Sequence, residues 1–138
     1  MEFTVKENVA IDQELDALLN EHRVNMGQVL TVEPVENFSF ALYQDDTFVG
    51  GLTARAKSGE FYIILLAVTE THREQGIGKQ LMQLAENKAR ELGCHHLLLT
   101  TYSYQGIHFY PAVGFQEMSR ITDYPELGVD KVYFIKYL

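Results

Sequence analysis

The stretch Val68-Thr69-Glu70-Thr71-His72-Arg73-Glu74-Gln75-Gly76-Ile77-Gly78-Lys79 is the most informative part of the sequence. It follows an apolar run, residues 61–68, and precedes a segment whose apolar residues have helical spacing. A strand that leads through two glycines into a helix leaves backbone N–H groups without partners at the positive end of the helix dipole. The stretch therefore predicts an anion-binding turn. The alternative is that Gly76 and Gly78 only allow the helix to pack closely on the strand.

Two familiar phosphate-binding motifs use similar parts but do not fit this stretch. The dinucleotide fingerprint G-x-G-x-x-G requires a third glycine where the sequence has Leu81. The P-loop motif G-x-x-x-x-G-K-[ST] requires a glycine at the position of Arg73 and a serine or threonine at the position of Gln80. Neither a dinucleotide-binding fold nor a P-loop fold is therefore predicted.

The rest of the chain reads as alternating strands and helices. Helical spacing of apolar residues predicts helices over about residues 10–22 and 77–92, the second ended by Gly93. Strands are expected at residues 3–5, 38–43, 47–54, 61–68, 95–101, from 114–115 onward and at 132–137, with a short helix near 105–110. The segment 22–34 is expected to be a second short helix or a loop. The run 61–68 is apolar on both alternating faces, which predicts a central strand buried on both sides.

Composition limits the classes of protein to consider. The chain has 138 residues, of which 46% are hydrophobic and 22% charged, and this predicts one globular domain over residues 1–138. No apolar run approaches membrane-spanning length and the first residues do not resemble an export signal, so no membrane partner is expected. A single cysteine, Cys94, fits a reducing cytoplasm and is interpreted as structural. The net charge of −8 argues against nucleic-acid binding and favours cationic partners.

Two blocks of sequence together resemble the GNAT superfamily of N-acetyltransferases. Arg73-x-x-Gly76-x-Gly78 fits the family signature [Q/R]-x-x-G-x-[G/A], and the stretch from Phe109 to Phe115 resembles its F-Y-x-x-x-G-F block. The resemblance covers roughly residues 38–138 and is nearest to a bacterial branch of small, mostly uncharacterised members. It implies the GNAT fold, an α/β architecture with a mixed, mostly antiparallel central sheet of six to seven strands. Helices are then expected on both faces, and the sheet should splay at its central strands.

The resemblance also implies where acetyl-coenzyme A (acetyl-CoA) binds. Main-chain groups of the central strand are expected to hold the pantetheine arm, and the glycine turn to hold the pyrophosphate, with Arg73 or Lys79 supplying positive charge. Ser103 stands where many relatives carry an asparagine that bonds the pantetheine arm. Pro111 departs from the family pattern and is expected to shorten or kink the helix after Tyr110. The implied cofactor-binding residues are Leu66, Ala67, Val68, Arg73, Glu74, Gln75, Gly76, Ile77, Gly78, Lys79, Ser103 and Tyr110.

The chemistry of acetyl transfer assigns two candidate catalytic residues. Tyr110 matches the family's tyrosine that faces the coenzyme A sulfur, and its alternative role is that of a core aromatic residue. A thiol with a pKa of about 8.5 and a tyrosine of about 10 favour a hydrogen bond to the leaving sulfur over full proton transfer. An alkylammonium with a pKa of about 10.4 needs a base before it can attack. Glu60 is the candidate base, and its alternative role is a solvated charge at a strand end.

The predicted reaction is direct transfer of acetyl from acetyl-CoA to a primary amine, without a metal or a covalent enzyme intermediate. His95 and His96 are adjacent on a strand and point to opposite faces, so they do not share a metal ion. Two alternatives stay open: an acyl-CoA-binding sensor or partner domain without transfer, and a transferase that uses a longer acyl chain or an oxygen acceptor. The enzyme is expected to be cytoplasmic and a possible homodimer. The acceptor is expected to be cationic, with the acidic residues Asp45, Asp46, Glu60, Asp123 and Glu126 near its cleft.

Overall fold

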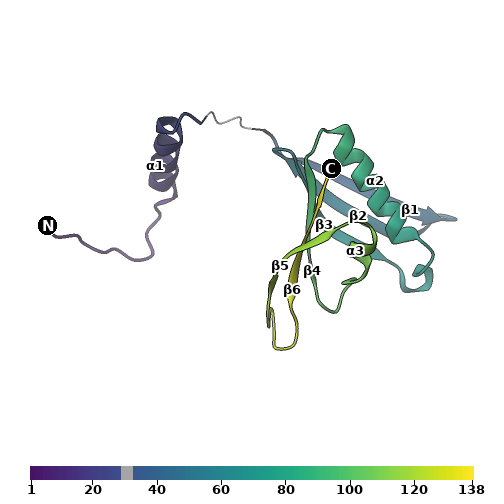
Figure 1. The fold of residues 1–138 in the computed structure, drawn as a ribbon. Coiled ribbons are helices and arrows are strands. Elements are labelled where there is room, and N and C mark those ends of the chain that lie inside the picture. The colour runs from purple at the N-terminus through teal and green to yellow at the C-terminus, as the bar shows by residue number, and fades with distance from the viewer. Residues whose placement is uncertain (29–32) are drawn as a thin grey trace. The chain divides into compact units, whose positions relative to one another are not determined.

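The structure, a computed structural model, describes residues 1–28 and 33–138 (Figure 1). The chain divides into two compact units, Met1–Val32 and Glu33–Leu138, and each is described by itself. The prediction of one domain over residues 1–138 stays a prediction. The expected helix or loop at 22–34 lies partly outside the described residues, and its first part belongs to helix α1.

The first unit contains one helix, α1 (Asp12–Asn25), which confirms the helix predicted over residues 10–22. Acidic residues occupy its first turn and basic residues its last turn, an order that complements the helix dipole. The strand predicted at residues 3–5 is wrong, because these residues are not paired with any described strand. Phe3 and Val5 are 84% and 81% exposed. A short apolar segment gains strand structure only where a neighbouring strand accepts its hydrogen bonds.

The second unit is built on a six-stranded sheet in the order β1-β2-β3-β4-β6-β5 (Figure 1). Every neighbouring pair is antiparallel except β3 and β4, which are parallel, so the predicted mixed and mostly antiparallel sheet is confirmed. The strands are β1 (Glu36–Gln44), β2 (Thr47–Lys57), β3 (Glu60–Val68), β4 (His96–Tyr102), β5 (Gln116–Ile121) and β6 (Lys131–Tyr137). Two-residue turns, Asp45-Asp46 and Ser58-Gly59, join the first three strands, and all four residues have positive φ, as tight hairpin turns require.

The central strands β3 and β4 stay paired over only three residues each. Glu60, Phe61 and Tyr62 pair with residues 96–98, and no pair follows, although both strands continue. On its other side β3 pairs with β2 along its whole length, with Ile64 as an extra residue between the pairs Ala54–Ile63 and Thr53–Leu65. Such a bulge bends a strand and increases its twist. The predicted splay of the central strands is therefore confirmed, and it frees the β4-facing edge of residues 63–68.

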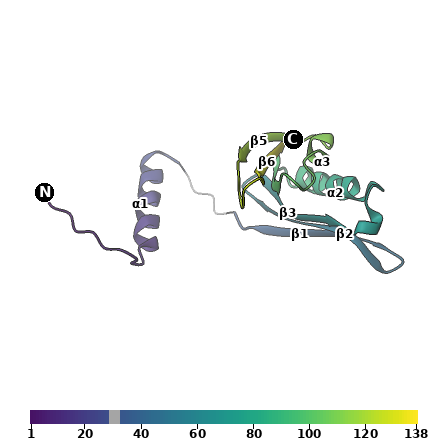
Figure 2. The same ribbon diagram turned by 90° about the horizontal axis from the view of Figure 1, so that it is seen from below.

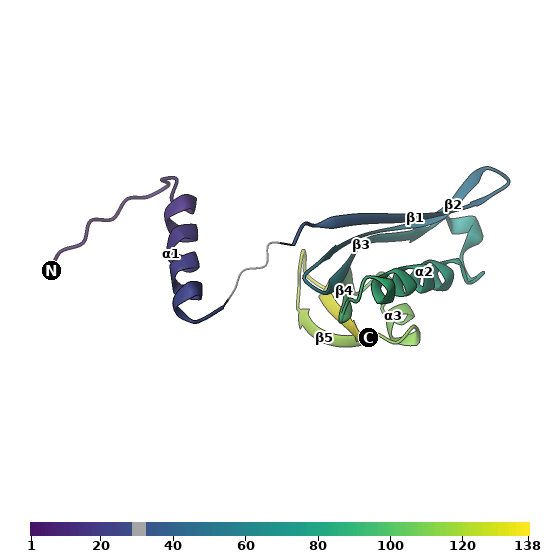
Figure 3. The ribbon, with the colours of Figure 1, turned by 90° about the horizontal axis from the view of Figure 1, so that it is seen from above.

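Helices α2 (Ile77–Glu91) and α3 (Phe109–Ala112) lie on the same face of the sheet (Figures 2 and 3). The buried face of α2 packs with apolar residues of β2, β3, β4 and β6 in one core, whose largest fully buried side chains include Phe61, Leu81, Leu97 and Phe134. The expectation that β3 is buried on both sides is wrong within this unit. Phe61 and Ile63 are buried, but Leu65 is 67% exposed. The presence of a helix on the second face stays a prediction.

The ends of the helices follow from local sequence. Gly93 has a φ of 74° after α2, and its neighbour Cys94 donates its N–H to the Ala89 carbonyl at 2.9 Å, which confirms the predicted helix end. The short helix predicted at 105–110 instead begins at Phe109. Pro111 does not end it after Tyr110, because Pro111 lies in the first turn, where a backbone N–H would have no helical partner.

A half-buried ion pair ties α2 to β6. The Lys136 ammonium lies 3.1 Å from the Glu86 carboxylate and donates a second hydrogen bond to the Val113 carbonyl at 3.0 Å. Arg90 donates to the same carboxylate at 3.0 Å. Burial alone would raise the pKa of Glu86, but the hydrogen bonds from Lys136 and Arg90 outweigh it and hold the pKa below its ordinary value of 4.5. The ionised carboxylate therefore stabilises the folded state.

Replacing Glu86 by alanine should lower the free energy of unfolding at pH 7 by about 1–3 kcal/mol, because Lys136 loses its partner. Since the folded pKa of Glu86 lies below the unfolded one, its contribution is complete above about pH 5.5 and disappears as pH falls through the folded pKa. Urea denaturation of both proteins should show a difference that shrinks between pH 7 and pH 3. Glu91→Ala on the same helix is the control, since Glu91 is exposed and pairs only with Lys88. A difference that does not depend on pH would contradict this account.

Candidate functional site

A groove runs from the splay of the sheet to the N-terminus of α2. Its first part, a cavity of about 520 Å³, lies where β3 and β4 have separated. Its second part, of about 430 Å³, lies along the glycine turn. The two parts share Val68, Arg73, Gly78 and Phe109, and therefore adjoin each other. The first part is lined by Leu66, Ala67, Val68, Arg73, Gly78, Thr101, Tyr104, Gln105, Gly106, Phe109 and Tyr110, and the second adds His72, Glu74, Gly76, Ile77 and Lys79.

The glycine turn presents a run of unpaired backbone donors. Among the described residues, none of the backbone N–H groups of residues 74–79 donates a hydrogen bond to another protein group. The first that does is Gln80, to the Gly76 carbonyl at 3.0 Å. Six successive free donors at the positive end of a helix form a concave anion site. The Arg73 and Lys79 side chains line the same part of the groove and add positive charge.

The two glycines of the turn serve different physical purposes. Gly76 caps α2 with a φ of 79°, a conformation that side chains disfavour, and a Cβ there would meet no other atom within 4 Å. Gly78 has ordinary backbone angles, but a Cβ there would lie 3.3 Å from the Phe109 ring. A larger side chain at residue 78 would therefore push against Phe109 at the junction of the two parts of the groove. The need for glycine at position 78 is steric, and at position 76 it is conformational.

The loop between β3 and the glycine turn is anchored to the first hairpin. The His72 ring bonds Gln44 Oε1 through Nε2 at 2.8 Å and Thr69 Oγ1 through Nδ1 at 2.9 Å. With the Gln44 oxygen as acceptor, Nε2 carries the proton and Nδ1 accepts from the hydroxyl. Thr69 also donates its N–H to the Val49 carbonyl at 2.9 Å. These bonds fix the path of the chain just before the anion site.

Tyr110 lines the cavity and also packs on the core. Its ring lies 5.5 Å from the Phe134 ring and 6.0 Å from the Phe115 ring. Its hydroxyl has no hydrogen-bond partner among the described residues. Burial raises the pKa of Tyr110 above its ordinary value of 10.0, so the hydroxyl stays protonated at neutral pH. The side chain is therefore a rigidly held hydrogen-bond donor at the splay.

The structure brings most of the predicted site residues into this groove. Residues 66–68, 73, 74, 76–79 and 110 all line it, whereas Gln75 lies on another part of the surface with its amide toward the Thr71 carbonyl. Glu60 lies at the paired end of β3 and β4, where His96 Nε2 is 3.0 Å from its carboxylate. The structure does not bring Glu60 to the groove, and its role as a base stays a prediction.

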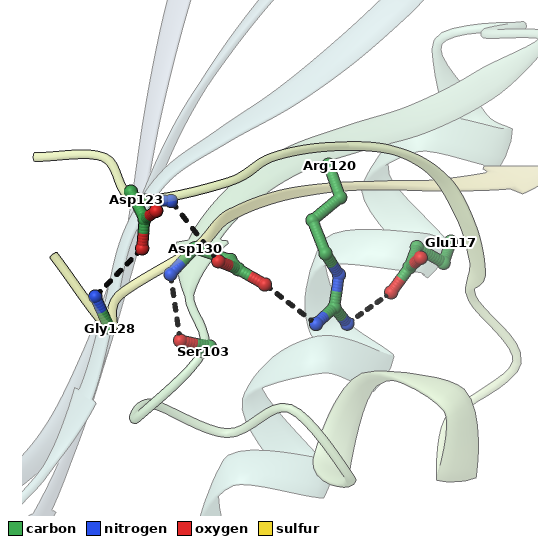
Figure 4. A network of polar contacts seen from close by, with 6 residues as sticks. All are labelled: Ser103, Glu117, Arg120, Asp123, Gly128 and Asp130. Carbon is green, nitrogen blue, oxygen red and sulfur yellow. Dashed lines mark hydrogen bonds and ion pairs between the residues drawn. The ribbon is translucent and has the colours of Figure 1, made fainter.

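Ser103 lies outside the groove and belongs to a network around Asp130 (Figure 4). Ser103 and Asp130 exchange two hydrogen bonds: the Asp130 N–H donates to Ser103 Oγ at 2.9 Å, and the Ser103 N–H donates to the Asp130 carbonyl at 2.8 Å. The Asp130 carboxylate accepts from Arg120 at 3.2 Å, and Asp123 accepts from the Gly128 N–H at 2.8 Å. The β5–β6 loop is thereby fastened to the chain segment that continues into the cavity wall.

Sequence reasoning did not assign a site role to part of the cavity wall, namely Thr101, Tyr104, Gln105, Gly106 and Phe109. Thr101 is 8% exposed and donates its hydroxyl to the Gln105 carbonyl at 2.9 Å, which shapes the turn after β4. The sequence did indicate an unusual role for Thr101. Leu97 and Leu99 face the core as alternate residues of β4, and Thr101 continues this alternation with a polar side chain. No sequence pattern indicated that Tyr104 and Gly106 line the cavity, because their positions depend on the conformation of the turn after β4.

Ser103→Ala tests whether this hydroxyl holds the β5–β6 loop or contacts the acyl donor. Loss of one hydrogen bond should speed amide hydrogen exchange in residues 122–130 by about 3- to 10-fold. The dissociation constant of acetyl-CoA should stay within twofold, because Ser103 does not line the groove. Ser119→Ala, an exposed serine on β5, is the control in exchange mass spectrometry and calorimetry. Unchanged exchange together with clearly weaker acetyl-CoA binding would instead support the contact that the family resemblance implies.

Two further observations concern other classes of site. Among residues 1–28 and 33–138, no group of three or more His, Cys, Asp or Glu side chains is arranged to hold a metal ion. None of the described helices is long and apolar enough to cross a membrane.

Known proteins resemble this chain in sequence and in structure. The chain is 30% identical to blasticidin-S acetyltransferase of Streptomyces morookaense over 112 residues, 80% of this chain and 82% of that protein. It is 32% identical over 77 residues to acetyltransferase Atu2258 of Agrobacterium fabrum, a match that spans little more than half of each protein, 56%. The crystal structure of an acetyltransferase from Bacillus cereus matches with a TM-score of 0.77 at 30% identity, covering 98% of both chains.

The fold is also shared with an aminoglycoside 6'-N-acetyltransferase, at a TM-score of 0.68 and 14% identity over 96% of this chain and 94% of that one. Residues 9–115 match the Acetyltransferase (GNAT) family, and this range includes the glycine turn and the Phe109–Phe115 block. The splayed sheet, the anion-binding turn and the family match lead to the same result. The chain belongs to the GNAT family of N-acetyltransferases.

Proposed function

We propose that the enzyme transfers the acetyl group of acetyl-CoA to a primary amine of a small cationic acceptor. The observation that carries this proposal is that two chemically different ends adjoin each other in one groove. One end offers free N–H donors and two cationic side chains to a diphosphate. The other end offers the unpaired edge of β3 and the Tyr110 hydroxyl to a thioester. The related fold of aminoglycoside 6'-N-acetyltransferase was solved with coenzyme A, which supports this assignment of ligand.

The free edge of β3 suits the amide groups of a pantetheine arm. Beyond Tyr62 this edge has no strand partner, so its N–H and C=O groups can bond an extended ligand as an added strand would. Arg73 reaches back to this edge and places Nε 3.4 Å from the Val68 carbonyl. Arg73 thus stands between the two ends of the groove and is positioned to contact the ligand on both sides.

Acetyl transfer needs help at the sulfur and at the nitrogen. The amine nitrogen attacks the thioester carbon, the new C–N bond replaces the C–S bond, and the sulfur leaves as a thiolate. Tyr110 donates a hydrogen bond to that thiolate. Because burial raises its pKa, Tyr110 is a weaker acid than an exposed tyrosine, and it stabilises the leaving group without giving up its proton. The ammonium proton of the acceptor is lost to water or to a base before attack, and the nitrogen loses a second proton to water or to a base as the amide forms and the thiolate leaves.

The acceptor is proposed to be cationic because the chain carries a net charge of −8. Two of the acidic residues expected near the cleft are already used inside the protein: Glu60 bonds His96, and Asp123 bonds the Gly128 N–H. The carboxylates of Asp45, Asp46 and Glu126 accept no hydrogen bond from another described residue and are the remaining candidates for capture. We further propose that the enzyme is cytoplasmic, which the single cysteine Cys94 supports. We also propose that it forms a homodimer.

A thiol-release screen with acetyl-CoA as donor tests the proposed function. The panel contains a polyamine, aminoglycosides, blasticidin S, peptides with free N-termini and neutral amines. At least one cationic amine should release coenzyme A, and its kcat/KM should fall between about 0.02 and 0.3 M salt as screening increases. Gly78→Val, with its fold checked by circular dichroism, should lose the rise in Tm that acetyl-CoA gives the parent protein. A rise in Tm without thiol release from any amine would favour a non-catalytic acyl-CoA-binding domain.

Tyr110→Phe should lower kcat by about 100-fold and leave the dissociation constant of acetyl-CoA almost unchanged. The reason is that the hydroxyl bonds the sulfur only as negative charge develops on it. Tyr104→Phe is the matched control, because Tyr104 lines the same cavity but is 68% exposed and should keep nearly full activity. Steady-state kinetics at saturating donor would contradict the assignment if both variants kept the parent kcat.

A further inference from the structure

A glutamate at position 74 is unfavourable in the anion site for two separate reasons. Its backbone has a φ of 63°, in the left-handed region that glycine adopts readily and other residues seldom adopt. The residue carries a carboxylate, yet Glu74 is among the residues that line the part of the groove with the free N–H groups, Arg73 and Lys79. Neither backbone conformation nor anion binding favours a glutamate at this position.

A nearby residue of the same turn shows which amino acid a positive φ favours. Gly76, two residues later, also has a positive φ and is a glycine. Among the described residues, no hydrogen bond or ion pair to the Glu74 carboxylate compensates its backbone strain. Residues that break a local rule without a compensating contact are concentrated at functional sites. The negative charge itself is then the property that Glu74 contributes.

The consequence for a bound diphosphate follows from electrostatics. Arg73 and Lys79 attract it, and Glu74 in the same part of the groove repels it. At a solvent-exposed site, one unit charge a few ångströms from a phosphate changes affinity by about 3- to 10-fold. Acetyl-CoA and the product coenzyme A carry the same diphosphate, so the repulsion weakens both equally, as uniform binding effects do.

We propose that Glu74 limits the affinity of the glycine turn for the coenzyme A diphosphate. This inference rests on the proposed function, because it takes the ligand of the turn to be coenzyme A. Glu74 lines the glycine-turn part of the groove and does not line the part that holds Tyr110.

A graded series of charges at residue 74 tests the proposal. In calorimetric titrations at about 0.05 M salt, Glu74→Gln should bind both coenzyme A and acetyl-CoA about 3- to 10-fold more tightly than the parent protein. Glu74→Lys should bind more tightly again. At about 0.5 M salt the gains should shrink to less than about 2-fold, because the Debye length is then only a few ångströms.

Three controls separate charge from other effects. Glu70→Gln removes a carboxylate from the same loop, but Glu70 does not line the groove, so affinity should not change. Pantetheine, which lacks the diphosphate, should bind the parent protein and Glu74→Gln equally. Glu74→Gly removes the charge and the backbone strain together, and it should match Glu74→Gln in affinity if charge is the cause.

The outcomes are distinct. Tighter binding by Glu74→Gln that disappears with salt, and is absent for pantetheine, supports the proposal. Unchanged or weaker binding by Glu74→Gln overturns it, as does tighter binding by Glu74→Gly alone, which would show that backbone strain is the cause. An equal gain for pantetheine also overturns it. A parent protein that binds neither acetyl-CoA nor coenzyme A would instead refute the proposed function.

Discussion

The separation of β3 from β4 after three paired residues is the constraint on which the site depends. Parallel pairing stops at Tyr62; beyond it β3, with a bulge at Ile64, stays paired with β2, and β4 stays paired with β6. The cavity lies at this divergence, and the free strand edge of residues 66–68 and Tyr110 both line it. A fully paired parallel sheet would satisfy more backbone groups but would have no place for an extended ligand at its centre.

The elements around the splay are held by polar contacts at some distance from the reacting atoms. His72 anchors the turn to Gln44, the Glu86–Lys136 pair holds α2 against β6, and Asp130 fastens the β5–β6 loop to Ser103. Each of these contacts uses a charged or polar side chain whose pairing reduces the cost of partial burial. Some carboxylates, such as Glu86 and Glu60, thus have partners within the fold, and net charge alone is a coarse guide to recognition.

Local sequence determined much of the fold. Hairpin turns, the glycine that ends α2, and the helical or alternating spacing of apolar residues act over a few neighbours, so the elements from β1 to β6 could be placed from the sequence. The glycine turn was predictable for the same reason, because its N–H groups are left free by the start of α2 itself. Errors arose where structure depends on distant partners: among the described residues of their own unit, residues 3–5 have no strand to pair with, and α3 begins only after the Thr101–Gln105 contact has shaped the preceding turn.

The sequence by itself therefore determined the family, the strand–turn–helix that binds an anion, and Tyr110 as a residue of interest. Tertiary structure alone decided which candidates share one groove. It placed Glu60 with His96 at the closed end of the splay and turned Ser103 toward Asp130, although Glu60 was expected to act on the attacking amine and Ser103 to contact the donor. It also showed that Glu74 has a left-handed backbone within the anion site. The physical reason is that strand divergence and side-chain direction are set by packing between segments far apart in sequence, which no local pattern of residues records.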